Sequence, residues 1–181
     1  MVDFIMREKS LLSKHECDVV INWFKRNRII QKDQPHTGYE YAVFYSHEEV
    51  SEDIVPLLEG IQTLTENYIK AYPEIDMRSD AFHIPSIRFK WWKPGTYFSN
   101  WHSEHTLKYP YRIAGFQIYL SDNNCETEFM NYDNEKSIAG NAIVFPSSWT
   151  HTHRGQIDPD GIDRYVISGY YELKVGAHSD L

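Results

Sequence analysis

The spacing of apolar residues changes near residue 83, and this change constrains the fold more than any other feature of the chain. Before it, apolar side chains recur every three or four residues, which is typical of amphipathic helices. The first predicted helix covers residues 14–27, where Ser13 and Glu16 form a capping-box pattern. The second begins after Ser51, a helix-capping residue, and ends before Pro73. A short strand is expected between the helices, at residues 41–45.

After the change, short runs of β-branched and aromatic residues alternate with turn residues, which is typical of strands. The predicted strands cover residues 84–92, 111–120, 126–132, 141–145 and 164–173. Two helices followed by a run of strands predict an α+β, mainly β fold, with the helices packed on a β-sandwich or barrel. A length of 181 residues is close to one domain of ordinary size.

Charge, hydropathy and cysteine content limit the class of protein to which this chain can belong. Lysine and arginine number 18 against 26 acidic residues, a net charge of −8, so the chain repels a phosphate backbone and nucleic acid is disfavoured as a partner. No apolar run reaches the roughly 18 residues of a membrane span. Two cysteines are too few for a disulfide-built fold, and residues 1–10 lack the apolar stretch of a signal peptide. A cytoplasmic protein without a membrane segment is expected.

Four of the nine histidines fall in two short clusters, W-H-S-E-H at residues 101–105 and W-T-H-T-H at residues 149–153. Residues two apart in an extended chain face the same side, so His102 and Glu104 converge. With His151 from a neighbouring strand they would form a facial set of two histidines and one carboxylate, which suits non-haem Fe(II). The alternative is a pair of polar strand edges that bind no metal, and the spacing alone leaves both interpretations open.

Several longer segments resemble, in order, the motifs of the prolyl 4-hydroxylase-like dioxygenases that depend on 2-oxoglutarate and Fe(II). K-P-G-T-Y-F-S-N-W-H-S-E at residues 93–104 is similar to the family's first iron motif. F-Q-I-Y-L-S-D at 116–122, E-T-E-F at 126–129 and G-N-A-I-V-F-P-S-S-W-T-H at 140–151 are similar to the following strands. Arg164 opens R-Y-V-I-S-G-Y-Y, where the family has its basic residue. The resemblance covers residues 87–173.

The resemblance implies a role for each matching position. His102, Glu104 and His151 would hold the iron, although His153 shares a strand face with His151 and is its rival. Arg164 would bind the distal carboxylate of 2-oxoglutarate, because its guanidinium can engage both oxygens. The other implied positions are Tyr119 and Ser168 beside that carboxylate, and Arg154 at the pocket mouth as a contact to substrate.

The resemblance also implies the architecture. The core would be a double-stranded β-helix, or jelly roll, over residues 81–175. Residues 1–80 would form a helical support packed on its outer face, and the whole chain, 1–181, would be one domain.

The implied activity is hydroxylation of an unactivated C–H bond with Fe(II), 2-oxoglutarate and dioxygen, without a catalytic residue beyond the metal centre. The substrate would be a prolyl residue of a protein or peptide, or a small molecule such as an amino acid. Two alternatives remain: a catalytically silent jelly-roll binding module, and a zinc-dependent hydrolase or isomerase on the same ligands. The chain departs from the family pattern at Glu104, where aspartate is usual, and at Asn124-Cys125, where Gly-Gly is frequent.

Overall fold

Two antiparallel sheets and two helices make up the computed structural model, which describes residues 2–27, 31–32, 39–45, 50–76, 82–156 and 159–174. The larger sheet has the strand order β1-β9-β6-β11-β5-β3-β2, with β4 paired to β11, and the smaller has the order β10-β7-β8. The helices are α1 (Lys14–Asn27) and α2 (Val55–Ala71). The strands are β1 (Met6–Glu8), β2 (Gln31–Lys32), β3 (Tyr39–Tyr45), β4 (Phe82–His83), β5 (Ser86–Trp92), β6 (Arg112–Tyr119), β7 (Asn123–Phe129), β8 (Glu135–Ser137), β9 (Ala142–Pro146), β10 (His153–Gly155) and β11 (Arg164–Leu173). Single 3-10 turns are η1 (Glu52–Ile54), η2 (Pro73–Asp76) and η3 (Trp149–His151).

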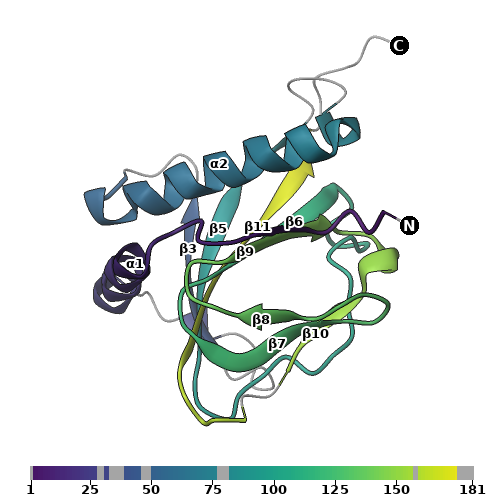
Figure 1. The fold of residues 1–181 in the computed structure, drawn as a ribbon. Coiled ribbons are helices and arrows are strands. Elements are labelled where there is room, and N and C mark those ends of the chain that lie inside the picture. Colours follow the sequence, from purple (N-terminus) through teal and green to yellow (C-terminus); the bar gives the residue numbers. More distant parts are fainter. Residues whose placement is uncertain are drawn as a thin grey trace.

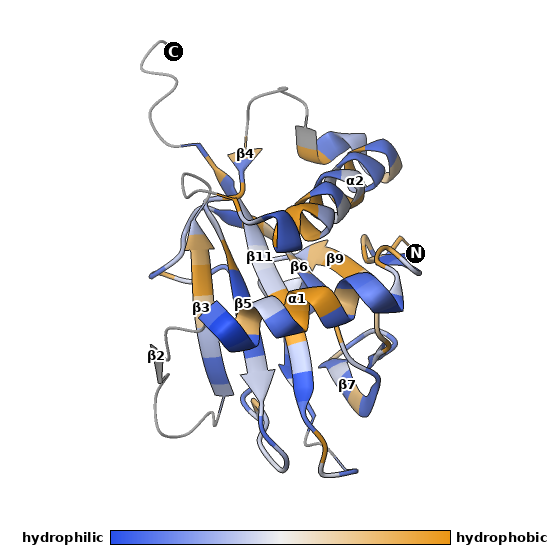
Figure 2. Ribbon diagram, turned by 90° about the vertical axis from the view of Figure 1, so that its left-hand side faces the viewer, coloured by the Kyte–Doolittle hydropathy of each residue, from blue (hydrophilic) through white to orange (hydrophobic). Residues whose placement is uncertain are grey.

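The helices lie on one face of the larger sheet, and the smaller sheet lies on the other (Figure 1). Apolar residues concentrate where α1 and α2 lie against the sheet (Figure 2). This main core joins residues from the helices, including Phe24 and Leu64, to residues from the strands, including Phe116 and Ile167. A second, smaller cluster includes Tyr119, Phe129, Ile143, Phe145 and Val166 and lies between the two sheets. The predicted α+β, mainly β class with helices packed on the strands is therefore confirmed.

Local sequence signals account for most element boundaries. Ser13 and Glu16 form the expected capping box, with Ser13 N 2.7 Å from the Glu16 carboxylate and Glu16 N 3.2 Å from the Ser13 hydroxyl. Along β6, Phe116 and Ile118 face the helices, while Gln117 and Tyr119 face the smaller sheet, as the alternation predicts. The sequence pattern misses five short strands of the described chain, β1, β2, β4, β8 and β10, because each has only two or three residues. None of the described helices is long and apolar enough to cross a membrane.

Gly140 lies against Leu12 of the N-terminal segment, and replacement of Gly140 tests this contact. Its φ is +86°, and an added Cβ would lie 2.1 Å from the carbonyl oxygen of Leu12. We expect Gly140→Ala to lower the free energy of unfolding by about 3 kcal/mol, from left-handed backbone strain and overpacking together. Gly161→Ala is the matched control. The φ of Gly161 is +66°, but an added Cβ would have no neighbour within 4 Å, so we expect a loss of about 1 kcal/mol in the free energy of unfolding. Equal losses in urea unfolding would contradict this account of Gly140.

Candidate metal and 2-oxoglutarate site

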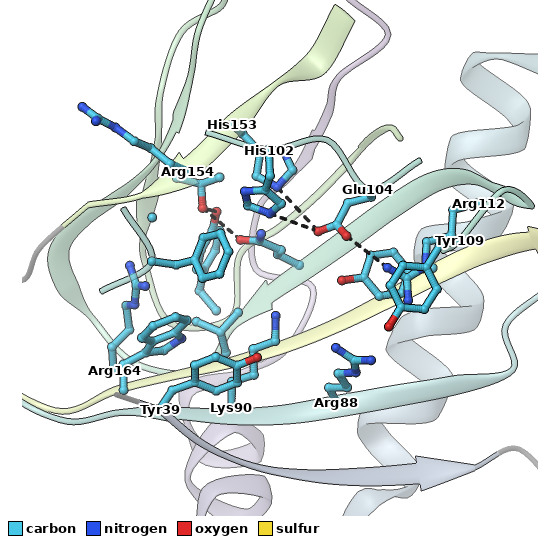
Figure 3. A pocket seen from close by; sticks show the side chains of 18 residues that line it. Tyr39, Arg88, Lys90, His102, Glu104, Tyr109, Arg112, His153, Arg154 and Arg164 are labelled. Atoms are coloured by element: carbon cyan, nitrogen blue, oxygen red, sulfur yellow. Dashed lines mark hydrogen bonds and ion pairs between the residues drawn. The ribbon is translucent and has the colours of Figure 1, made fainter. Parts of the chain in front are cut away.

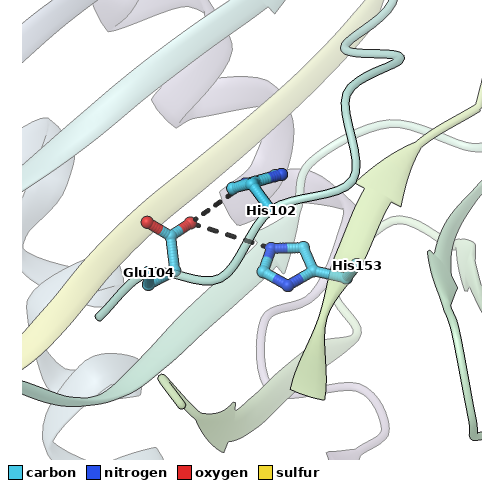
Figure 4. Close-up of side chains that lie close together, drawn as sticks. All are labelled: His102, Glu104 and His153. Carbon is cyan, nitrogen blue, oxygen red and sulfur yellow. Dashed lines mark ion pairs between the residues drawn. The ribbon is translucent and has the colours of Figure 1, made fainter. Parts of the chain in front are cut away.

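Three potential metal ligands converge in a pocket between the two sheets. One ligand atom from each of His102, Glu104 and His153 lies within 4.8 Å of the others (Figure 4). The Glu104 Oε1 atom is 3.5 Å from His102 Nε2 and 3.7 Å from His153 Nε2. Donors at right angles around a metal with bonds of about 2.1 Å lie roughly 3 Å apart, so small side-chain movements bring these atoms to bonding distance.

The backbone sets both histidines in the tautomer that a metal requires. His102 and His153 form an isolated antiparallel bridge, with N–O distances of 3.0 and 2.9 Å. The Nδ1 atom of each ring is 3.0 Å from a backbone carbonyl, that of Asn100 for His102 and that of His151 for His153. Each Nδ1 therefore carries the proton, and both Nε2 lone pairs face the Glu104 carboxylate. Two lone pairs and a carboxylate oxygen facing one another are a donor set that a cation stabilises.

The structure corrects the prediction that His151 completes this set. Residues Trp149–His151 form the 3-10 turn η3, and the strand β10 begins only at His153. The His151 ring lies apart from the pocket: its Nε2 is 2.6 Å from the Asp3 carbonyl and its Nδ1 is 2.9 Å from the Thr150 hydroxyl. Both ring nitrogens are engaged, and burial lowers the pKa of His151. The rule that residues two apart share a face fails here because the chain is not extended through this segment.

Arg112 contacts Glu104 from the side away from the histidines, and no pattern in the sequence singles it out. Its Nη1 is 3.2 Å from Glu104 Oε2, and its Nε is 3.2 Å from Glu172 Oε1. The guanidinium lies 3.7 Å from the Tyr109 ring centre and 3.5 Å from that of Tyr170, which fixes it by cation–π contacts.

Removal of Arg112 is expected to weaken metal binding. With Oε2 no longer held, the longer glutamate side chain rotates, so we expect Arg112→Met to lower the affinity for Co(II) by about 10–100-fold, as for other groups that orient metal ligands. Arg112→Lys should restore part of the affinity. The visible Co(II) spectrum should also change in Arg112→Met, which a purely structural role would leave unaltered. Unchanged affinity and spectrum would show that Arg112 does not position Glu104.

The wall opposite the metal ligands is strongly cationic, in contrast to the acidic chain as a whole. In Figure 3, Arg164, Lys90 and Arg88 extend from the larger sheet toward the ligands, whereas Arg154 points away from them. Burial lowers the pKa of Lys90 to about 8; Glu104 opposes this shift, and the nearby arginines add to it. The cavity has a volume of about 240 Å³. An anionic ligand of small size fits this wall.

The remaining predicted positions lie around this cavity with different partners. Arg164 is buried on β11, 5.3 Å from the Trp92 ring centre, and lines the pocket. Tyr119 also lines it, with its hydroxyl 2.8 Å from that of Thr127. Arg154 lies over Trp101 and is ion-paired with Glu128.

Ser168 lies between the pocket-lining residues Val166 and Tyr170 on the same face of β11. It is buried but is not among the residues that line the cavity, and its Oγ has no hydrogen-bond partner within the described part of the chain.

Sequence comparisons find no match: neither a protein-family model nor a curated protein aligns with the chain. Solved structures do match over nearly its whole length. A collagen prolyl hydroxylase of Paramecium Bursaria Chlorella virus-1, in complex with 2-oxoglutarate, has a TM-score of 0.71 at 19% identity, covering 94% of this chain and 96% of that one. A prolyl-4-hydroxylase of Pseudomonas putida has a TM-score of 0.73 at 13% identity, covering 96% and 94%.

A third match is a prolyl hydroxylase of Trichoplax adhaerens in complex with a peptide fragment of hypoxia inducible factor. Its TM-score is 0.70 at 14% identity, covering 95% of this chain and 84% of that one. At these identities the likeness concerns the fold. The resemblance seen in the sequence is confirmed at that level: the chain has the fold of the prolyl 4-hydroxylase-like 2-oxoglutarate and Fe(II) oxygenases.

Proposed function

We propose that this protein is a 2-oxoglutarate- and Fe(II)-dependent dioxygenase that hydroxylates an unactivated C–H bond. The observation that carries the proposal is the convergence of His102 Nε2, His153 Nε2 and the Glu104 carboxylate in one cationic pocket. Two imidazoles and one carboxylate leave coordination positions free for a co-substrate and dioxygen. When bound, Fe(II) with 2-oxoglutarate and dioxygen supplies oxidative decarboxylation of the co-substrate, giving succinate and carbon dioxide, coupled to hydroxylation of the substrate.

The chain's own residues would bind, orient and shield the reactants. His102, Glu104 and His153 would hold the metal, with Arg112 restraining the second oxygen of Glu104. Arg164 would pair with the distal carboxylate of 2-oxoglutarate through its planar guanidinium. Tyr119 lies on the neighbouring strand, where Tyr119 and Val166 are cross-strand partners, and would donate a hydrogen bond to the same carboxylate. Ser168 remains a proposed partner that must rotate toward the cavity.

We further propose that the two facing sheets are the halves of a double-stranded β-helix over residues 81–175, within a single domain of residues 1–181. The support from residues 1–80 includes strands as well as helices, because β1 pairs with β9 and β3 pairs with β5 at the larger sheet. For the substrate class we propose a prolyl residue of a protein or peptide, in line with the matched prolyl hydroxylases, or a small amino acid. The viral and Trichoplax enzymes are prolyl hydroxylases, and the latter is complexed with a peptide.

Oxygen consumption and succinate formation test this function. The expected result is slow turnover of 2-oxoglutarate by the Fe(II)-loaded protein without substrate when ascorbate supplies the two electrons that the substrate would otherwise give, with equal amounts of oxygen consumed and succinate formed. Replacement of Fe(II) by Zn(II) should abolish it. A zinc-dependent hydrolase or isomerase would instead work without oxygen, and a silent binding module would form no succinate with either metal.

A further inference from the structure

The charges in the pocket do not balance if 2-oxoglutarate is its sole anionic ligand. Among the described residues, five cationic side chains line the cavity: Arg88, Lys90, Arg112, Arg154 and Arg164. Arg112 is neutralised by Glu104 and Glu172, and Arg154 is paired with Glu128. Under the proposed function, Arg164 receives the distal carboxylate of the co-substrate. Two cations of β5 remain to be explained.

Arg88 and Lys90 have no carboxylate partner within the described part of the chain. The groups around Arg88 are tyrosines: Tyr109 and Tyr170 line the cavity with it, and the centre of the Tyr41 ring lies 6.0 Å from its guanidinium. Lys90 Nζ lies 5.7 Å from the centre of the Tyr39 ring. Rings and a hydroxyl compensate a partly buried cation less well than an anion does. Burial and the charges of the nearby arginines lower the pKa of Lys90 to about 8.

The position of Arg88 along the sheet separates it from the proposed co-substrate anchor. Arg164 and Trp92 are cross-strand partners, and Arg88 lies four residues farther along β5, roughly 13 Å in an extended strand. The carbon backbone of 2-oxoglutarate contains four bonds of about 1.5 Å and is at most roughly 6 Å long. One molecule held at Arg164 and at the metal therefore leaves the end of the pocket near Arg88 for another ligand.

We propose that Arg88 and Lys90 form a second anion subsite, which binds a carboxylate of the primary substrate. Both side chains extend from the same face of β5 toward the metal ligands (Figure 3). The cavity of about 240 Å³ is smaller than most ligand pockets, so the part of the substrate that enters is small. A free amino acid has this size and charge. The inference rests on the proposed function, whose co-substrate it assumes.

Pairs of acids and amides test the subsite directly. The twenty common amino acids and their primary amides are titrated, without oxygen, into protein loaded with Fe(II) and 2-oxoglutarate, and binding is measured by calorimetry. We expect at least one amino acid to bind at least tenfold more tightly than its amide. Arg88→Met and Lys90→Met should each remove most of that difference, while Arg88→Lys should retain it. Lys136→Met removes an exposed charge of β8 and controls for net charge.

Each outcome decides for or against the subsite. Acids and amides that bind alike, or an absence of binding by either, would overturn it. The subsite would also be overturned if Arg88→Met weakened the binding of 2-oxoglutarate as strongly as the loss of Arg164 does. Arg88 would then belong to the co-substrate site. Arg88→Gln, which keeps a polar but uncharged side chain at this position, replaces Arg88→Met if the latter does not fold. Failure of wild-type protein to bind 2-oxoglutarate at all would instead refute the proposed function.

Discussion

Replacement of His153 by alanine is expected to abolish tight metal binding, whereas replacement of His151 is expected to leave it nearly intact. His153 Nε2 faces the Glu104 carboxylate beside His102, and its Nδ1 is held by a backbone carbonyl. Loss of this donor removes one of three proposed ligands. The expected fall in Fe(II) affinity is therefore at least about 100-fold, the upper end of what loss of a group that merely orients a ligand causes.

His151→Ala should show the opposite pattern. It removes the contacts of the ring to the Asp3 carbonyl, the Thr150 hydroxyl and the stacked Tyr132 ring. We expect a loss of about 2 kcal/mol in the free energy of unfolding and a change of less than about threefold in metal affinity. Anaerobic equilibrium dialysis and urea unfolding of both variants measure the two effects. A loss of metal binding in His151→Ala with retention in His153→Ala would contradict the structure.

The second large effect is expected for Arg164. Two charge-assisted hydrogen bonds to the distal carboxylate contribute about 3 kcal/mol together, so Arg164→Met should lower the affinity for 2-oxoglutarate about 100-fold. Metal affinity should stay within a factor of about three, because Arg164 is not among the three converging ligands.

Arg154→Met is a matched control for Arg164→Met, since Arg154 lines the same pocket but is paired with Glu128. Calorimetric titration of the metal-loaded proteins with 2-oxoglutarate compares the two variants. Similar losses in both would mean that general positive charge attracts the co-substrate and that Arg164 is not its specific anchor.

The sequence predicted the elements well where a periodic pattern continued for several turns or strand residues. The helix Lys14–Asn27 and the strand Arg164–Leu173 have the predicted bounds. The error at His151 arose where the pattern was too short: W-T-H-T-H suits a strand equally well whether it begins before or after His151. The pairing of His102 with His153 decides between them, and contacts of this kind, between residues distant in sequence, are not contained in a local pattern.

Long-range contacts also explain why the cationic wall was missed. Arg88, Lys90 and Trp92 alternate on one face of β5, a pattern visible in the sequence, but nothing local shows that this face points into a pocket. The same holds for Arg112, whose partners Glu104 and Glu172 come from two other segments. Glutamate instead of the family's usual aspartate was a reason to question the iron site. In the structure the longer side chain reaches both the histidines and Arg112.

The proposed function depends most directly on joint binding of Fe(II) and 2-oxoglutarate. Anaerobic titration of Fe(II)-loaded protein with 2-oxoglutarate, followed by visible absorption, measures this binding through the charge-transfer band of a chelated keto acid. We predict a band that saturates at one equivalent, is absent in His153→Ala and persists in His151→Ala. Wild-type protein that binds Fe(II) but develops no band would contradict the dioxygenase assignment.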